Sequence, residues 1–166
     1  MSIEPINPKD RLLATLRIVH KESQHLEWSR QRLFQQPIDA RWVQALDAYP
    51  ERAERLEAFV SRYGRMQDTI AQKLLPRWLL ALAEEPGSLL EVLNRAERLG
   101  VIENTDQWLE ARQLRNRLVH EYMEDSTFFA ASIQLAEGYC AMLLDTYQRL
   151  RKDVVHRLGI AQADLP

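Results

Sequence analysis

The stretch LEAFVSRYGRMQDTIAQKLL (residues 56–75) decides the fold class, because its apolar residues recur every three or four positions. That spacing is typical of one buried face of an α-helix, whereas the faces of a β-strand alternate every second residue. The apolar stripe consists of Leu56, Phe59, Val60, Tyr63, Met66, Ile70 and Leu74. Gly64 lies inside this helix at a cost of about 1 kcal/mol relative to alanine. Its presence indicates that another part of the protein packs closely there.

Helical spacing continues on both sides of this stretch. The helices that spacing and caps predict cover about residues 8–34, 40–49, 50–75, 76–82, 89–99, 106–122 and 126–158. Side-chain oxygens that can accept from the first backbone N–H groups stand at four of the starts: Asn7, Asp39, Ser88 and Asp125. Pro76 should kink the long helix or restart it, since proline cannot donate the helical hydrogen bond. Gly100 should end a helix in the left-handed conformation that glycine adopts readily.

These elements predict an all-α protein, an antiparallel four-helix bundle with additional short helices, in a single domain that covers residues 1–166. The chain is long enough to bury a core of its own. Two apolar stripes, Phe59–Leu74 and Ile133–Val154, could each serve that core or the seam of a dimer. Their spacing does not separate these alternatives.

Composition narrows the class of protein. Hydrophobic residues make up 46% and charged residues 28% of the 166 positions, as in an ordered globular protein. The net charge of −2 lacks the basic surplus of a non-specific nucleic-acid binder, but 22 Lys and Arg residues leave a local basic cleft open. The single cysteine, Cys140, excludes an intramolecular disulfide, and its place in an apolar stripe predicts a buried, unreactive thiol. With no leader pattern and no apolar run of about 18 residues, a cytoplasmic protein that does not enter the membrane is expected.

The stretch RNRLVHEY (residues 115–122) carries groups suited to phosphate chemistry. A guanidinium binds phosphate with a planar fork of donors, and an imidazole titrates near neutral pH. On a regular helix Arg115 and Tyr122 lie within about 20° of each other, whereas Arg115 and His120 lie about 140° apart. Either the helix loosens near His120, or these groups converge with their copies across a two-fold axis. The second arrangement requires a homodimer.

The same residues also have a purely structural interpretation. Three arginines could form a solvated helix face, and a histidine near a helix C-terminus is favoured by the helix dipole alone: Arg112, Arg115, Arg117 and His120. Four further basic residues could extend an RNA path or form scattered ion pairs: Arg62, Arg65, Lys73 and Arg77. The tryptophans lack the periodic spacing of a stacking platform, so packing in a core or an interface is expected for Trp28, Trp42, Trp78 and Trp108. Neither a His-Glu-x-x-His run nor an Asp-rich loop is present, so no metal and no cofactor is expected.

The run Arg115-Asn116-x-x-x-His120-x-Tyr122, near the end of the penultimate long helix, resembles the signature of the HEPN superfamily. The tyrosine two residues after the histidine resembles in particular the HepT-type toxins of two-gene toxin–antitoxin pairs. The segments 52–75 and 93–108 also look like helices of these proteins. The resemblance covers about residues 12–158, and the short helix that Asp39 caps, together with the long N-terminal helix, exceeds a minimal bundle of this kind.

The resemblance implies a HEPN-like bundle and a metal-independent ribonuclease whose cleft lies at a homodimer interface. Arg115 would bind the scissile phosphate and stabilise its developing charge. His120 would act as general base toward a ribose 2′-hydroxyl or as general acid toward the leaving oxygen. Asn116 would orient a phosphate or the imidazole.

The resemblance also implies a partner, a minimal nucleotidyltransferase antitoxin that transfers AMP onto Tyr122 and so blocks the cleft, in a dimer or a larger hetero-oligomer. An alternative within the same family is a non-catalytic nucleotide- or substrate-binding subunit that partners a nucleotidyltransferase. A third interpretation is a helical dimerisation protein in which the motif is incidental. Substitution of His120 separates these alternatives, because only a ribonuclease loses cleavage while it keeps its fold.

Overall fold

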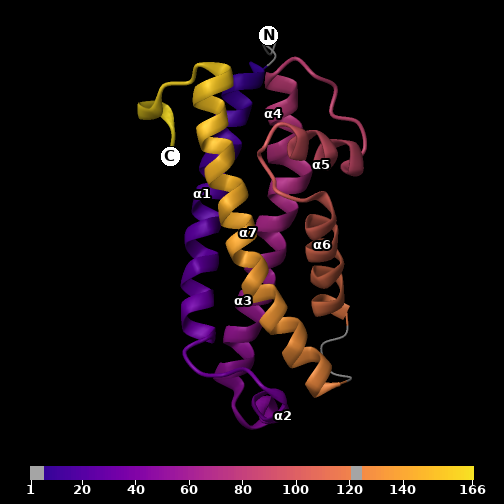
Figure 1. Cartoon of the computed structure of the whole chain (residues 1–166). Coiled ribbons are helices and arrows are strands. Elements are labelled where there is room, and N and C mark those ends of the chain that lie inside the picture. Colours follow the sequence, from indigo (N-terminus) through magenta and orange to yellow (C-terminus); the bar gives the residue numbers. More distant parts are fainter. Residues whose placement is uncertain (1–5, 121–124) are drawn as a thin grey trace, which may run out of the picture. The chain divides into compact units, whose positions relative to one another are not determined.

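The computed structural model describes residues 6–120 and 125–166, without the side chain of His120. Every regular element in these ranges is helical, which confirms the all-α prediction (Figure 1). The α-helices are α1 (Pro8–Leu33), α2 (Ala40–Gln44), α3 (Pro50–Thr69), α4 (Leu75–Ala81), α5 (Leu89–Arg98), α6 (Thr105–His120) and α7 (Ser126–Leu158). The shorter elements are the 3-10 helices η1 (Leu46–Ala48) and η3 (Gln162–Asp164) and the π-helix η2 (Ile70–Leu74).

Local side-chain chemistry sets several of these helix ends, as the sequence predicts. The carboxylate of Asp39 accepts from the backbone N–H of Trp42 at 2.9 Å and so caps α2. The hydroxyl of Ser88 caps α5, and the carboxylate of Asp125 accepts from the backbone N–H groups that open α7. Gly100 ends α5 with φ +77°, a left-handed conformation that glycine adopts without the penalty of a Cβ atom.

The widened turn η2 explains how the chain accommodates Pro76. A proline removes one helical hydrogen bond, and its ring crowds the carbonyl four residues earlier. In η2 the backbone N–H of Leu75 donates to the carbonyl oxygen of Ile70, five residues back, so the turn immediately before Pro76 is wider than an α-helical turn. Helical structure then resumes as α4. The sequence predicted a kink or a new segment here, and the structure resolves it as a π-turn.

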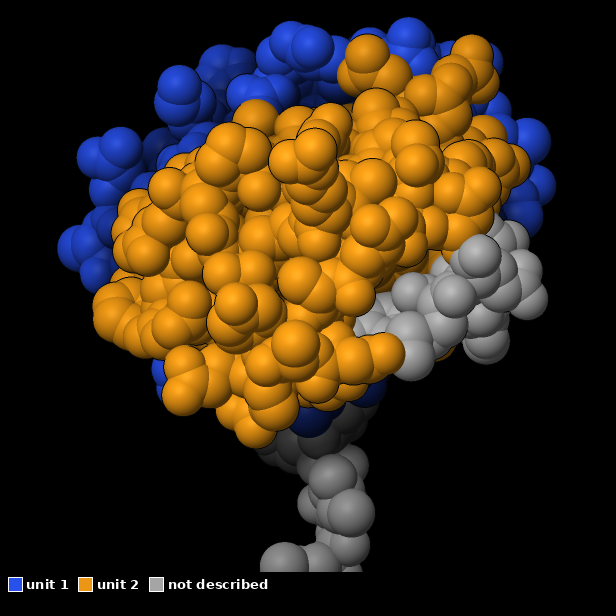
Figure 2. Space-filling view, turned by 90° about the horizontal axis from the view of Figure 1, so that it is seen from below, with its two compact units in different colours: residues 1–21, 68–105, 145–166 blue, residues 22–67, 106–144 orange. Residues whose placement is uncertain are grey.

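The described residues divide into two compact units, which Figure 2 colours separately. Unit 1 comprises Met1–Lys21, Asp68–Thr105 and Asp145–Pro166, and unit 2 comprises Glu22–Gln67 and Asp106–Leu144. Each unit is therefore assembled from stretches that are distant in sequence. The single domain expected from chain length stays a prediction.

Four helical segments of unit 2 contact one another in turn. They are the second part of α1, α3, α6 and the first part of α7. Polar contacts link them in the order α1–α3, α3–α6, α6–α7 and α7–α1, through Arg62–Ser29, Tyr63–Ala111, Tyr139–Glu110 and Arg30–Glu137. This arrangement leaves α6, which carries the motif, between α3 and α7.

The two apolar stripes that the sequence left undecided lie in the core. Their buried members are Leu56, Phe59, Tyr63, Met66, Ile70 and Leu74 from the first, and Ile133, Ala136, Cys140, Leu143, Tyr147, Leu150 and Val154 from the second. Burial also raises the pKa of the Cys140 thiol to about 12, so the thiolate is scarce at neutral pH. The predicted burial of the cysteine is confirmed.

α7 is long and apolar enough to cross a membrane by length and composition, with a window of mean hydropathy 1.3. It is the one such helix in the described part of the chain. The sequence holds no uninterrupted apolar run of about 18 residues, so α7 meets this test on the mean of its window. The core helix of a soluble protein passes the same test, and 39% of this window is buried inside the protein.

Candidate functional site

The predicted site residues lie at the C-terminal end of α6. Arg115 is partly buried, Asn116 is exposed, and His120 is the last residue of the helix. The side chain of His120 and the whole of Tyr122 lie outside the described residues. The geometry of the site is therefore built from Arg115 and its surroundings.

The side chain of Arg115 lies against the backbone of α3 at Gly64. A Cβ atom at position 64 would stand 3.1 Å from Nε and 3.2 Å from Cγ of Arg115, closer than ordinary van der Waals contact. One helical turn earlier on α6, the carbonyl of Ala111 accepts a hydrogen bond from the buried Tyr63 hydroxyl at 3.1 Å. Tyr63 and Gly64 thus hold α3 and α6 close together, and the missing side chain at Gly64 makes room for Arg115.

This contact confirms that something packs closely on Gly64, and it identifies the partner as the predicted phosphate-binding arginine. Asn116 adds a second constraint, since its Oδ1 accepts from Nη1 of Arg115 at 3.3 Å. The guanidinium is therefore oriented from two sides. A role of Asn116 toward a phosphate or the imidazole stays a prediction.

The course of α6 bears on the two geometries that the spacing left open. α6 is helical through His120, so it does not loosen between Arg115 and His120. Positions five apart on such a helix point about 140° away from each other. The described part of α6 therefore does not bring positions 115 and 120 onto one face, and convergence with a second copy stays a prediction.

Helix α7 carries an exposed stripe of apolar and small residues, which begins next to α6. Its members on α7 are Phe128, Ala131, Leu135 and Gly138, and we call them the α7 stripe. Phe128 is 47% and Leu135 is 54% exposed. The other exposed positions between Thr127 and Ala141 are also uncharged. The guanidinium carbon of Arg117 lies 5.7 Å from the centroid of the Phe128 ring, which places the start of the stripe next to the C-terminal part of α6.

The basic residues considered for an RNA path divide between the two units. Arg62 and Arg65 belong to unit 2, whereas Lys73 and Arg77 belong to unit 1. Arg77 donates to the Thr15 hydroxyl at 2.7 Å, and burial together with the nearby Arg11 lowers the pKa of its guanidinium. Each unit therefore offers its own basic residues.

The prediction that tryptophans pack inside holds for three of the four. Trp42, Trp78 and Trp108 are buried, whereas Trp28 is 59% exposed, so Trp28 does not pack in the core of this chain, and packing in an interface stays a prediction for it. The sequence contains a signal for this exposure. Trp28 follows the buried Leu26 by two positions, which turns it about 200° around the helix from the apolar stripe.

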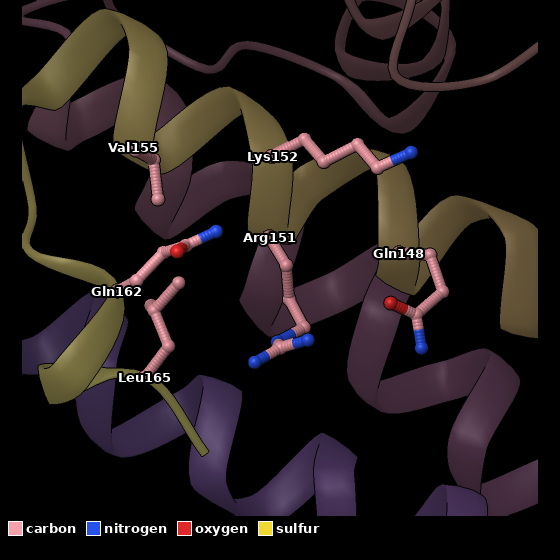
Figure 3. A pocket seen from close by; sticks show the side chains of 6 residues that line it. All are labelled: Gln148, Arg151, Lys152, Val155, Gln162 and Leu165. Atoms are coloured by element: carbon pink, nitrogen blue, oxygen red, sulfur yellow. The ribbon is translucent and has the colours of Figure 1, made fainter.

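A further groove lies in unit 1, along the C-terminal part of α7 (Figure 3). It has a volume of about 490 Å³, and its lining includes Arg151, Gln162 and Leu165. Nη2 of Arg151 donates to the carbonyl oxygen of Pro166 at 2.6 Å, so the C-terminal segment occupies part of this guanidinium. In Figure 3 the side chain of Lys152 extends to the right, away from Gln162 and Leu165. The groove thus offers a weaker case for ligand binding than the arginine on Gly64.

Within residues 6–120 and 125–166, no group of three or more His, Cys, Asp or Glu side chains is placed to hold a metal ion. Comparisons of the chain with family models, with curated proteins and with solved structures give no match. The function is therefore argued from the residues and their geometry.

Proposed function

We propose that this protein is a metal-independent ribonuclease, the toxin of a toxin–antitoxin pair, with Arg115, His120 and Asn116 as its catalytic residues. The observation that carries the proposal is the seating of Arg115. Its guanidinium is oriented by Gly64 and Asn116 on a partly buried helix face, as the binding of a scissile phosphate requires. An arginine side chain that extends into solvent would not require a glycine on the neighbouring helix to make room for it.

The proposal includes the HEPN-like antiparallel four-helix bundle. It is supported by the order of contacts in unit 2, where α1, α3, α6 and α7 touch in turn. Neighbouring helices along that order run in opposite directions in Figure 1. In such a bundle, site residues project from facing helices into a common space.

In the proposed reaction Arg115 binds the phosphate and stabilises the charge that develops on its oxygens. His120, as general base, removes the proton of the ribose 2′-hydroxyl, or, as general acid, protonates the leaving 5′-oxygen. The 2′-oxygen forms a new bond to phosphorus while the bond from phosphorus to the 5′-oxygen breaks. The products are a 2′,3′-cyclic phosphate and a 5′-hydroxyl; His120 handles one of the two protons, water takes or supplies the other, and no metal takes part.

The active form is proposed to be a homodimer that pairs through the α7 stripe. The stripe is apolar, uncharged and exposed, and its small residues Ala131 and Gly138 allow two helices to approach closely. A two-fold axis through it is self-complementary, since each copy presents the same face. In the proposed dimer, His120 of one copy would work with Arg115 of the other, which the separation of about 140° between the two positions on α6 favours.

The proposal also includes the regulation that the resemblance to HepT-type toxins implies. A minimal nucleotidyltransferase antitoxin would transfer AMP onto Tyr122 in the cytoplasm. Positions seven apart on a regular helix, such as 115 and 122 in the sequence, share a face to within about 20°. The phosphate of the adduct would then pair with Arg115 and exclude RNA.

The experiment that tests the function is induced expression of the wild type beside His120→Ala, with growth and total RNA integrity as readouts. Thermal melts establish that the variant folds. The proposal predicts that the wild type arrests growth and degrades RNA and that the folded variant does neither. A wild type that is harmless without its partner and leaves RNA intact overturns the ribonuclease and favours the non-catalytic binding subunit.

Gly64→Ala should separate the seating of Arg115 from the stability of the fold. Alanine raises helix propensity by about 1 kcal/mol, whereas its Cβ forces Arg115 to move by a few tenths of an ångström. We expect an unchanged or higher melting temperature with RNA cleavage lowered about tenfold, since misplacement of a catalytic group costs rate. Ser61→Ala, at an exposed position of α3, is the matched control and should cleave like the wild type. Full activity of Gly64→Ala would contradict the role of this contact.

A further inference from the structure

A groove in unit 2, between α1 and α3, combines an exposed indole with three guanidiniums. Its volume is about 540 Å³, and the residues that give it chemical character are Trp28, Arg32, Glu51, Glu54, Arg55 and Arg62. Arg62 and Gly64 are two positions apart on α3 and point about 200° away from each other. The groove therefore lies on a different side of α3 from Arg115, and it is a separate site.

Trp28 provides a flat aromatic surface at one wall of this groove. Its side chain is 59% exposed, and the guanidinium carbon of Arg32 lies 5.7 Å from the centroid of its ring. Unstacked bases bind on aromatic rings and on arginine planes, and a base can use both.

The guanidiniums on the opposite wall are available to an anion. Nη1 of Arg62 donates to the Ser29 hydroxyl at 2.6 Å and to the carbonyl of His25 at 3.3 Å, and both acceptors are neutral. None of Arg32, Arg55 and Arg62 forms an ion pair with a carboxylate of the described residues. Arg62 is thus oriented by neutral acceptors and is not held in an ion pair among the described residues, which suits a phosphate.

Two carboxylates and a small residue complete the groove. Glu51 and Glu54 can accept hydrogen bonds from the exocyclic amino groups of a base. Ala58, one helical turn from both Glu54 and Arg62, leaves the floor open. The groove therefore holds a separate group for each part of a nucleotide, namely the face of the base, its edge and its phosphate.

We propose that this groove binds one nucleotide of a single-stranded nucleic acid, with the base on Trp28 and the phosphate on Arg55 and Arg62. The inference rests on the proposed function only for the choice of RNA over DNA. If the protein is a ribonuclease, the groove holds one nucleotide of the RNA substrate at a place other than the bond that is cut. It would retain RNA on a protein whose net charge is negative.

The test measures binding without cleavage. Full-length His120→Ala is titrated into a fluorescein-labelled single-stranded RNA of about ten nucleotides, and anisotropy is followed over a series of salt concentrations. Further substitutions are added to this parent: Trp28→Ala, Trp28→Phe, Arg55→Ala and Tyr49→Ala. Tyr49 is the matched control, because it is an exposed aromatic with Arg52 over its ring at 4.1 Å but does not line the groove.

Trp28→Ala should weaken binding about tenfold, the loss of one base stacked on an aromatic ring. Trp28→Phe should restore most of the affinity. Arg55→Ala should weaken binding and lower the slope of log K against log salt by about 0.7, the value for one phosphate contact on a single strand. Tyr49→Ala should bind like the parent. A Trp28→Ala protein that binds RNA like the parent, or a Tyr49→Ala protein that loses as much, overturns the proposal.

The possible results of these experiments distinguish a failure of the groove proposal from a failure of the ribonuclease proposal. If Trp28→Ala loses RNA binding while the wild type never cleaves RNA, the ribonuclease falls and the groove stands. If the wild type cleaves RNA and Trp28→Ala binds it unchanged, the groove falls and the ribonuclease stands. If Trp28→Ala alters only the sedimentation of the protein, the groove is a protein contact and the proposal fails. Equal loss on DNA of the same sequence supports the stacking site and removes its preference for RNA.

Discussion

Arg115→Ala should lower the rate of RNA cleavage by about 10²–10³-fold, the loss found when one donor to a developing oxyanion is removed. The melting temperature should change little, because the side chain of Arg115 is partly exposed. The measurement is a single-turnover cleavage rate on a labelled RNA, beside a thermal melt of the same preparation.

Two further substitutions sharpen this result. Arg115→Lys keeps the charge but loses the planar fork of donors, so it should recover only a small part of the rate. Arg52→Ala removes another partly buried arginine of unit 2, one that lies over the ring of Tyr49, and it should cleave like the wild type. A folded Arg115→Ala protein with the wild-type rate would remove Arg115 from the chemistry.

Leu135→Glu should dissociate the proposed dimer and abolish cleavage with it. The substitution places a charge in the middle of the α7 stripe, where two copies would otherwise bury apolar surface against each other. Leu135 is 54% exposed in one chain, so the monomer should keep its fold. Sedimentation velocity reports the loss of the dimer, and the cleavage rate is measured on the same sample.

Leu90→Glu is the matched control for this prediction. Leu90 is 51% exposed on α5, outside the α7 stripe, so the same change of side chain should leave the protein dimeric and active. If Leu135→Glu sediments as a dimer, the seam lies elsewhere. If it is a monomer that still cleaves at the wild-type rate, the site is complete in one chain.

The predictions that held depend on local chemistry. Asp39 and Ser88 cap their helices because a side-chain oxygen meets a backbone N–H only a few residues away. Gly100 ends α5 for an equally local reason, its left-handed backbone. Such features are readable in a sequence because no distant segment is needed to form them.

The features that escaped prediction depend on contacts between distant segments. The sequence predicted a close approach at Gly64 and a phosphate site at Arg115 as two separate features. Only the packing of α3 on α6 shows that Arg115 is the side chain that lies against Gly64. The predicted stripe of α7 included the buried Ile133 and left out the exposed Leu135, but whether its members face the core or a second copy depended on the packing of distant helices. The position of Trp28 on the helix predicts its exposure, because it lies on a different face from the apolar stripe. The general expectation that tryptophans pack in a core or an interface was applied instead.

We propose that Arg115 of one copy works with His120 of another, and mixing two inactive variants tests this most directly. Arg115→Ala and His120→Ala are each purified, unfolded or dissociated together at equal amounts, and allowed to reassemble. Half of the resulting dimers contain one chain of each kind, and each of these holds one composite site with both wild-type residues. The account predicts recovery of about a quarter of the wild-type cleavage rate, as expected for a two-fold dimer with shared sites. A mixture as inactive as either parent, with mixed dimers verified by differently tagged chains, would contradict it.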